Sequence, residues 1–404
     1  MENKNEWKKV KLGEIVTITM GQSPKSEFYN SSEKGMPFLQ GNRTFGRIFP
    51  FFDTYTTKIT KIAQKNDIIM SVRAPIGDLN IATENICLGR GVCSLKMNNG
   101  NHSFLFYLMK HYSSQLINRG NGTVFTSINK NEISNLNTYI PTNEIIQKKI
   151  AKILSDIDER IELNNKINDN LEKQLQFLYK SWFVDFIPFG KVIPLNWEKI
   201  LLSDIADFIN GYSYKGKELA ESNIAMATIK NFSRNGTFNT DGYKEIIISE
   251  KVKPEHYLKD FDILVAHTDL TQNADIIGNA EMIFNKLNYQ DIIFSMDLVK
   301  VIPKNKNISK FLLILLLKNA NFKNHCLSYV NGTTVLHLSK KALQEYKVFL
   351  PKNLEVLNPL IDLISKIYKN FSILSKENEK LANLKNYLLP KLMNGEIDVE
   401  KIEL

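Results

Sequence analysis

The sequence predicts an α+β fold, with two mixed α/β globules in a pseudo-twofold arrangement separated by two long helices that form an antiparallel coiled coil. Three observations lead to this prediction. The chain has 404 residues, a length typical of two or three domains rather than one. It repeats itself, and each repeat ends in a long stretch with coiled-coil spacing. The expected boundaries are residues 1–141 for the first globule, 142–187 for the central helix, 188–351 for the second globule, and 352–404 for the C-terminal helix and tail.

The internal repeat is visible near both ends of each globule. Trp7-Lys-Lys-Val-Lys-Leu-Gly-Glu-Ile matches Trp197-Glu-Lys-Ile-Leu-Leu-Ser-Asp-Ile, which lies 190 positions later. Farther on, Asn121-Gly-Thr matches Asn331-Gly-Thr at an offset of 210. The second copy therefore carries about 20 extra residues in its middle. Pseudo-twofold symmetry follows from such a duplication.

Each globule consists of short β-rich runs separated by turn residues, followed by one amphipathic helix. At about 140 residues, each globule is long enough to fold around its own core. The helices are expected at residues 103–117 and 309–322. The strands are expected at residues 67–72, 79–82 and 91–96 in the first globule, and at 224–229, 262–266, 276–283 and 296–302 in the second.

After each globule the apolar residues follow a repeating 4-3 spacing, which predicts a coiled-coil helix. Asn164, Asn168, Asn378 and Lys385 interrupt seams that are otherwise apolar. The apolar seam positions are Ile150, Leu154, Ile157, Ile161, Leu171, Leu175 and Leu178 in the first helix, and Leu360, Ile364, Ile367, Phe371, Leu374, Leu381 and Leu388 in the second.

The helix ends also carry sequence signals. Thr142 or Asn143 can cap the first helix, and Gly395 is expected to end the second. Residues 145–182 would span on the order of 55 Å at about 1.5 Å per residue. An antiparallel pair would bury both apolar stripes and hold the globules at opposite ends of a rod. Asn168 and Asn378 occupy equivalent positions, where a buried amide would fix the register; partial solvation of both is the alternative.

Composition narrows the function class. With 52 Lys and Arg residues against 43 Asp and Glu, the net charge is +9, which favours an acidic partner such as nucleic acid. The three cysteines, Cys87, Cys93 and Cys326, have no Cys-x-x-Cys spacing, so we expect buried thiols in a reducing cytoplasm. The polar N-terminus is unlike a signal peptide, and residues 311–317 are too short to span a membrane. A cytoplasmic protein without membrane contact is expected.

Signatures of catalysis and of metal binding are weak. Gly211-Tyr-Ser-Tyr-Lys-Gly-Lys-Glu resembles a phosphate-binding loop, but Glu218 stands where a Ser or Thr is required. The six histidines form no metal-binding or nucleophile-activating motif, and the His267/Asp269 pair is read as structural. We expect no catalytic residues, no metal site and no cofactor in this chain.

Loops rich in Gly, Asn and basic residues beside aromatics recur in both globules. Arg, Asn and Gln side chains can read base edges, whereas Lys, Thr and backbone amides bind phosphates. Taken singly, a loop Arg is usually a solvated charge and Asn-Gly is first of all a turn. The candidate DNA-binding residues are Gln40, Asn42, Arg43, Arg47, Arg73, Arg90, Asn121, Thr123, Lys215, Lys217, Lys230, Arg234, Asn331 and Thr333.

In this order of globule, helix, globule and helix, the whole chain resembles the DNA-specificity (S) subunit of type I restriction–modification systems. The second half departs from the first at one place, because His267-Thr-Asp-Leu stands where the first half has Arg73-Ala-Pro-Ile. The residues that carry the resemblance are the paired Trp7 and Trp197 openings, Met20-Gly-Gln-Ser-Pro24, Arg73-Ala-Pro-Ile-Gly77, Gly89-Arg-Gly91, Met296-Asp-Leu-Val299, and the helix ends Leu178-Tyr-Lys-Ser-Trp-Phe and Leu388-Leu-Pro-Lys-Leu-Met-Asn-Gly.

The resemblance implies a non-catalytic, sequence-specific DNA-binding subunit. Each globule would be a target-recognition domain reading one half of a bipartite, asymmetric site in double-stranded DNA, and the helices would set the distance between the halves. It further implies two methyltransferase (M) subunits for adenine methylation and restriction (R) nuclease/ATPase subunits for cleavage. Two other readings stay open: a non-catalytic coiled-coil scaffold with two protein-binding modules, and a single-chain enzyme whose site has no recognised motif.

Overall fold

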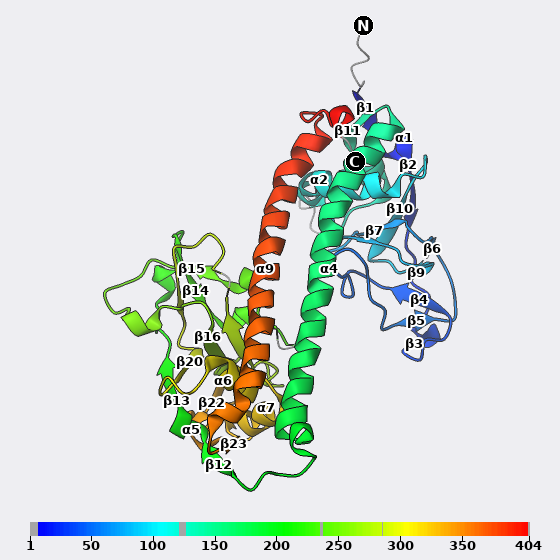
Figure 1. Cartoon of the computed structure of the whole chain (residues 1–404). Helices are drawn as coiled ribbons and strands as arrows, with labels where there is room; N and C mark the ends of the chain where they lie inside the picture. Colours follow the sequence, from blue (N-terminus) through cyan, green and yellow to red (C-terminus); the bar gives the residue numbers. More distant parts are fainter. Residues whose placement is uncertain (1–6, 121–126, 235–236, 285, 403–404) are drawn as a thin grey trace. The chain divides into compact units, whose positions relative to one another are not determined.

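The computed structural model describes residues 7–120, 127–234, 237–284 and 286–402. These residues form two compact units, Met1–Ile161 with Leu381–Leu404 and Glu162–Lys380. The two long helices, α4 (Glu144–Phe183) and α9 (Asn358–Met393), each contribute residues to both units (Figure 1). The helix that was expected at residues 145–182 is therefore confirmed as α4.

Unit 1 is built on three sheets. Strands β1 (Trp7–Lys11) and β11 (Asn137–Pro141) pair antiparallel, with Trp7 opposite Pro141. A four-stranded sheet has the order β2 (Val16–Met20), β10 (Val92–Met97), β7 (Ile68–Ser71) and β8 (Leu79–Ile81). A five-stranded sheet has the order β3 (Tyr29–Asn30), β5 (Tyr55–Thr56), β4 (Met36–Leu39), β9 (Ile86–Leu88) and β6 (Ile62–Ala63). The helices of its globule are α1 (Leu12–Ile15), α2 (His102–Gly120) and α3 (Lys130–Ser134).

Unit 2 repeats the first two sheets. Strands β12 (Trp197–Leu201) and β23 (Lys347–Pro351) pair antiparallel, with Trp197 opposite Pro351. The four-stranded sheet has the order β13 (Ala206–Asn210), β20 (Leu298–Pro303), β16 (Asp262–Ala266) and β18 (Ala280–Ile283). Two three-stranded sheets follow. The first has the order β15 (Lys244–Glu245), β14 (Ile224–Ala227) and β19 (Asp291–Phe294). The second has the order β17 (Thr268–Asp269), β22 (Leu336–Leu338) and β21 (Val330–Asn331). The helices of its globule are α5 (Leu202–Ile205), α6 (Lys310–Leu317), α7 (Ala320–Leu327) and α8 (Lys340–Glu345).

The predicted duplication is confirmed by this topology. The Trp-to-Pro ladder and the four-stranded order recur strand for strand, although the two copies share few residues. The additional sheets differ in extent: β5-β4-β9 and β15-β14-β19 have the same pairing, but the first continues with β3 and β6, and among the described residues only the second copy has the β17-β22-β21 sheet. The α+β architecture with two repeated globules is therefore one scaffold that carries two different elaborations.

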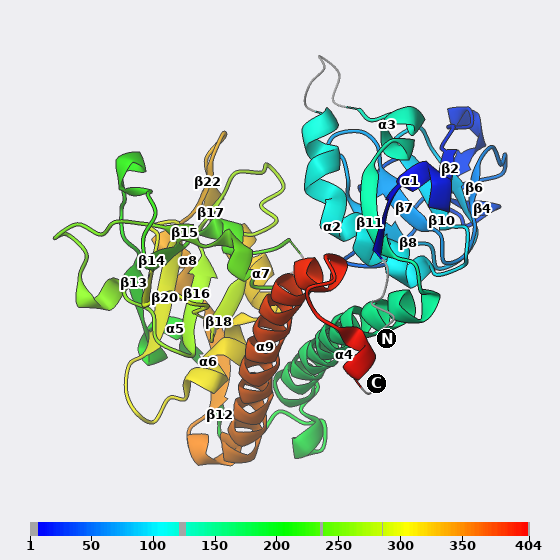
Figure 2. The ribbon, with the colours of Figure 1, turned by 90° about the horizontal axis from the view of Figure 1, so that it is seen from above.

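In each unit the long helices are part of the hydrophobic core. In unit 1, Ile150 and Leu154 of α4 and Leu392 and Met393 of α9 cluster with α2 and the four-stranded sheet. In unit 2 the end of α4 and the start of α9 cluster with α6, which packs on β16, β18 and β20 (Figure 2). The start of one helix thus shares a core with the end of the other, as in the predicted antiparallel pair.

Burial along the predicted seams changes with position. The first four seam residues of each helix and Leu175 are buried, whereas Leu171, Leu178, Leu374, Leu381 and Leu388 are only partly buried. In unit 2 the amide of Asn164 donates to Oδ1 of Asn378 at 2.9 Å, and Asn378 donates to Oδ1 of Asn165 at 3.0 Å. Asn168 and Asn378 are both partly exposed as residues, although Oδ1 of Asn168 is itself buried, whereas Asn164 is fully buried. Directional bonds therefore fix the register here.

The cap predictions hold, and two element predictions were wrong. Asn143 accepts from the Ile145 amide at the start of α4, and Gly395 has a left-handed backbone beyond α9. The single helix expected at residues 309–322 is two helices, because Asn319 bonds the Leu316 carbonyl and caps α7 through the Phe322 amide. The strand expected at residues 276–283 begins only at Ala280, after a turn at Gly278.

Candidate nucleic-acid interface

Four candidate residues of unit 1 lie in the loop between β4 and β5, residues 40–54, and a fifth, Arg90, lies beside it. Asn80, which is fully buried on β8, holds this loop through two bonds: its Oδ1 accepts from the Gly46 amide at 3.0 Å, and its amide donates to the Gly46 carbonyl at 2.9 Å. The Ile81 amide donates to the Ile48 carbonyl at 2.8 Å. The loop is thereby fastened to the edge of the four-stranded sheet.

Gln40 and Arg90 lie at the same place although 50 positions separate them. Ser23 Oγ donates to Gln40 Oε1 at 2.9 Å and accepts from the Arg90 amide at 3.0 Å. Side chains on the flanking glycines would collide with this arrangement, since a Cβ on Gly89 would lie 2.7 Å from the Gln40 Cα. The fold brings this pair of sequence-predicted residues together on an exposed face.

The remaining polar residues of the loop are bound to carboxylates. Asn42 donates to Asp78 at 2.6 Å. Arg43 forms a two-pronged pair with Asp53 at 2.7 and 2.8 Å while 72% of its side chain stays accessible, and this hydrogen bonding lowers the pKa of Asp53. Arg47 donates to Asp158 of α4 at 2.5 Å. Arg43 thus presents its charge outward, whereas Arg47 faces the helix.

Arg73 is exposed at the end of β7, and its side chain makes no hydrogen bond or ion pair with a described residue. The adjacent Ala74–Pro75 peptide bond is cis. Arg90 is likewise exposed, and within the described residues its guanidinium has no partner. Unlike Arg43 and Arg47, these two arginines have guanidinium groups without a carboxylate partner among the described residues, so a phosphate or a base edge can reach them directly. Asn121 and Thr123 lie outside the described residues.

In unit 2 the loop that resembles a phosphate-binding site is occupied by its own carboxylate. Glu218 accepts from the Lys215 amide at 2.5 Å and from the Tyr212 hydroxyl at 2.8 Å. These bonds lower the pKa of Glu218, the Lys215 amide contributing first. The loop amide that would face a phosphate is therefore bound to an anion already, but Lys215 and Lys217 project outward and are exposed.

The other unit 2 candidates are spread over three loops. Lys230 is exposed beyond β14, and Arg234 lies 3.4 Å from Asp275 with 74% of its side chain accessible. Asn331 and Thr333 are exposed in the β21–β22 hairpin, where the Thr333 carbonyl accepts from Gln272 at 2.5 Å. Three of the six exposed candidates of this unit are lysines, which suit phosphate contacts.

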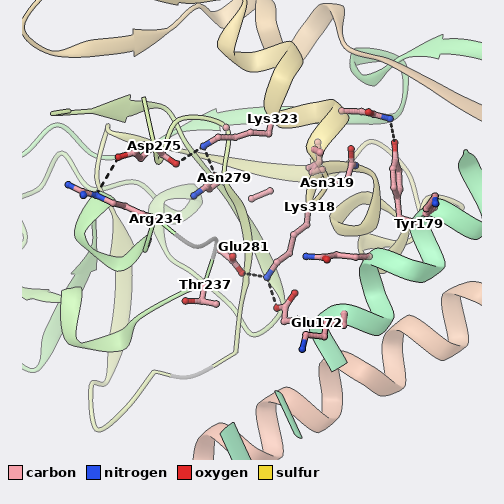
Figure 3. A pocket seen from close by; sticks show the side chains of 18 of the residues that line it. Glu172, Tyr179, Arg234, Thr237, Asp275, Asn279, Glu281, Lys318, Asn319 and Lys323 are labelled. Carbon is pink, nitrogen blue, oxygen red and sulfur yellow. Dashed lines mark hydrogen bonds and ion pairs between the residues drawn. The ribbon is translucent and has the colours of Figure 1, made fainter. Parts of the chain in front are cut away.

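Sequence reasoning missed a cavity in unit 2, lined by α4, the α6–α7 junction and the loop before β18, with a volume of about 880 Å³ (Figure 3). Lys318 lies in its wall and donates at 2.7 Å to both Glu172 and Glu281. Burial alone would lower the pKa of Lys318, but the two carboxylates raise it overall. Burial raises the pKa of Glu281 to about 7. Arg234 and Asp275 face one another at the rim.

The His267/Asp269 pair and the three cysteines lie in largely buried surroundings. Asp269 is fully buried and accepts from the Thr271 and Ile276 amides, and burial lowers the pKa of His267. All three cysteines are buried and free. The described part of the chain contains no group of three or more His, Cys, Asp or Glu residues arranged to hold a metal ion. None of its helices is both long and apolar enough to cross a bilayer.

Comparisons with known proteins agree with the repeat and the fold. The family described as the type I restriction modification DNA specificity domain matches residues 4–173 and 194–386. The MjaVIII specificity subunit of a type I restriction enzyme from Methanocaldococcus jannaschii is 25% identical, with 98% of this chain and 94% of that protein covered. The provisionally assigned MjaX specificity subunit of the same organism is 40% identical over 172 residues, which is 42% of this chain and 40% of that protein.

The three-dimensional comparison extends over nearly the whole chain. The crystal structure of the S subunit of a type I restriction-modification system from M. genitalium has a TM-score of 0.61 with this structure. It covers 97% of each chain at 20% sequence identity. At that level of identity the similarity concerns the fold.

Proposed function

Because this chain belongs to the type I restriction–modification DNA specificity family, we propose that its two globules read the two halves of a split, asymmetric site in double-stranded DNA. The chain is a non-catalytic specificity subunit, so the chemistry belongs to other subunits. Its partners in this proposal are methyltransferase subunits, two per chain, and restriction subunits that cleave DNA. The buried free thiols support the expected reducing, cytoplasmic compartment.

One observation carries the proposal: two copies of a single scaffold bear different loops and sheets. The ladder from Trp7 to Pro141 and the ladder from Trp197 to Pro351 are equivalent, yet the elaborations beyond them differ. Equivalent scaffolds bind DNA in equivalent ways, and different loops then contact different bases. The half-sites are therefore expected to differ in sequence, which makes the whole site asymmetric.

The residues divide into two groups by what their side chains are free to bind. Exposed Lys215, Lys217 and Lys230 are suited to phosphates, which contribute affinity without sequence preference. Gln40, Arg73 and Arg90 carry planar hydrogen-bonding groups, of which the Arg groups only donate. Such groups discriminate base edges by roughly 1–3 kcal/mol per contact. Arg43 joins this second group when DNA displaces Asp53.

We attribute the unread spacer between the half-sites to α4. This helix is an uninterrupted stretch of 40 residues, about 60 Å at a rise of roughly 1.5 Å per residue. Two readers on one duplex have to match a helical repeat of roughly 34 Å. Insertion of seven residues after Asn164 is expected to lengthen the spacer or to abolish recognition.

The test is single-molecule mapping of methylated adenines in cells that carry this chain with its neighbouring methyltransferase. We expect a split motif that disappears when this gene is deleted and returns on complementation. Arg73→Ala is expected to lower specific binding more than nonspecific binding, with Lys352→Ala, which removes an exposed charge directly after β23, as control. No motif, together with DNA binding that is weak and lost with salt, would instead indicate a protein-binding scaffold.

A further inference from the structure

One buried carboxylate in unit 1 lies where the β4–β5 loop meets both long helices. Asp158 of α4 is 2% exposed. It accepts from Arg47 of the loop at 2.5 Å, from Lys385 of α9 at 2.7 Å, and from the Tyr107 hydroxyl of α2 at 2.9 Å. Three elements and a loop are thus joined through one side chain.

The groups around Asp158 hold one another in place through charge and hydrogen bonding. Arg47 and Lys385 share the same oxygen, Oδ1, so each cation lies close to the other and depends on Asp158 for neutralisation. Oδ2 is held by Tyr107, whose pKa is raised first by burial and then by the charge of Asp158. The hydroxyl therefore stays a donor, and each carboxylate oxygen has a partner. Charge-assisted bonds of this kind restrict geometry strongly when they are buried.

The contact with Asp158 also limits the movement of the neighbouring loop residues. Asn42 is bound to Asp78 on one side of Arg43, and Arg47 is bound to Asp158 on the other side. Arg43 lies between these two anchors with 72% of its side chain accessible. The two bound neighbours therefore fix the backbone that carries Arg43, while its pair with Asp53 within the loop orients the guanidinium group.

We propose that Asp158 is a positioning residue that fixes the β4–β5 loop, through Arg47, in the orientation needed to discriminate the half-site read by unit 1. The inference rests on the proposed function, since it names how one of its readers is held. It assigns Arg47, a candidate DNA contact from the sequence, to the loop anchor. Because Lys385 binds the same oxygen, the orientation of the loop depends on how α9 pairs with α4 within unit 1.

Positioning is to be distinguished from two simpler roles. If Arg47 itself contacted a base, replacing Arg47 would relax specificity, whereas freeing Arg47 from Asp158 by a change at Asp158 would not. If the cluster served stability alone, weakening it would lower the unfolding midpoint and affect both half-sites alike. A positioning role predicts that both changes relax the unit 1 half-site and leave the unit 2 half-site intact.

The experiment uses the full chain assembled with its methyltransferase and compares four variants. Asp158→Asn keeps the side-chain volume and weakens the hold on Arg47. Arg47→Met removes the partner that the loop supplies to Asp158. Asp158 stays bound to Lys385 and Tyr107, so the variant leaves no buried carboxylate without a partner. Arg47→Lys conserves the charge and the single contact. Asp156→Asn is the matched control, because Asp156 lies two positions away and pairs with Lys152 on the exposed face of α4.

Methylation mapping and competition binding at fixed salt supply the readout. We expect Asp158→Asn and Arg47→Met each to lower the ratio of specific to nonspecific binding roughly tenfold, with degeneracy confined to one half of the motif. Arg47→Lys and Asp156→Asn should retain the ratio. Relaxation by Arg47→Met alone, relaxation of both halves, or relaxation of neither would overturn the inference. A wild-type complex without a split motif would overturn the proposed function and the inference with it.

Discussion

Removal of the ammonium group of Lys318 is expected to destabilise unit 2 in a manner that depends on pH. Its Nζ lies 2.7 Å from one oxygen of Glu172 and 2.7 Å from one of Glu281. The side chains of Lys318 and Glu281 are 17% and 6% accessible, and the second oxygen of Glu281 has no hydrogen-bond partner among the described residues. Lys318→Met would leave two carboxylates facing each other across an apolar side chain.

The magnitude follows from which groups are charged. Removing one partner of a buried pair costs about 3–5 kcal/mol, and the partial exposure of Glu172 places this case near about 3 kcal/mol. Burial raises the pKa of Glu281 from 4.5 to about 7, so its contribution to stability is fully present below pH 4.5 and is lost as the pH rises through 7. Lys318 opposes this shift, and its removal therefore extends the loss to higher pH. We expect a loss of about 3 kcal/mol at pH 8.5 and about 1 kcal/mol at pH 5.5, where Glu281 is protonated.

Urea unfolding measured by tryptophan fluorescence tests this. Trp7→Phe removes the tryptophan of unit 1, so Trp182 and Trp197 report unit 2. In that background Lys318→Met is compared with Lys318→Met/Glu281→Gln, which should recover most of the stability at pH 8.5 because a neutral amide replaces the second acid. An equal loss at both pH values, or a loss below about 1 kcal/mol at pH 8.5, would refute the reasoning.

Three further predictions concern packing, phosphate contacts and thiol burial. A Cβ on Gly211 would lie 2.0 Å from the Ser295 carbonyl oxygen, so Gly211→Ala should lower the unfolding free energy by about 1–3 kcal/mol. Gly216→Ala is the control, because a Cβ there meets nothing within 4 Å, and equal unfolding midpoints of the two variants in urea would contradict the prediction. Alanine at Lys215, Lys217 or Lys230 should each reduce the slope of log affinity against log salt by about 1, and an unchanged slope would exclude that lysine from the phosphate contacts. Burial raises the pKa of Cys93 and Cys326 to about 12, so neither thiol should react with a thiol reagent at pH 8 until urea unfolds the chain; rapid labelling of the native protein would contradict their burial.

Elements with long or regular patterns could be predicted from the sequence. The heptad spacing predicts α4 and α9 because it persists through many turns. The run at residues 262–266 matches β16 because strand length and apolar content agree there. Strands such as β3, β5 and β6 have two residues each and show no period. Their existence depends on pairing across the sheet.

The break between α6 and α7 shows how a single side chain can override a pattern. Residues 309–322 have the apolar content of one helix, which is why one was expected. Asn319 instead bonds the carbonyls at the end of α6 and caps the start of α7. The interruption positions Lys318 at the end of α6, where its side chain reaches both Glu172 and Glu281.

The candidate site was only partly predictable, because its contacts join residues that are far apart in the chain. Exposed arginines and lysines in loops were found by residue type alone. The pairing of Arg47 with Asp158, 111 positions away, has no local signature. One signal was nevertheless present: Lys385 interrupts an apolar seam, and a cation at such a position requires a buried acid. Asp158 is that acid.

Both copies attach their globules to α4 through an acid on the helix and a base on the globule, but at different positions. In unit 1 the pair is Asp158 of α4 with Arg47 of the loop, and in unit 2 it is Glu172 of α4 with Lys318 of the globule. At the offset of 210 the positions of Asp158 and Lys385 correspond to Tyr368 and Leu175, and the position of Glu172 corresponds to Ala382, so neither helix acid has a counterpart. A globule moved onto the other copy's helices would therefore lose its partner acid on the helix. It follows that new specificities made by exchanging globules should retain folding only when the matching helix segments are exchanged with them.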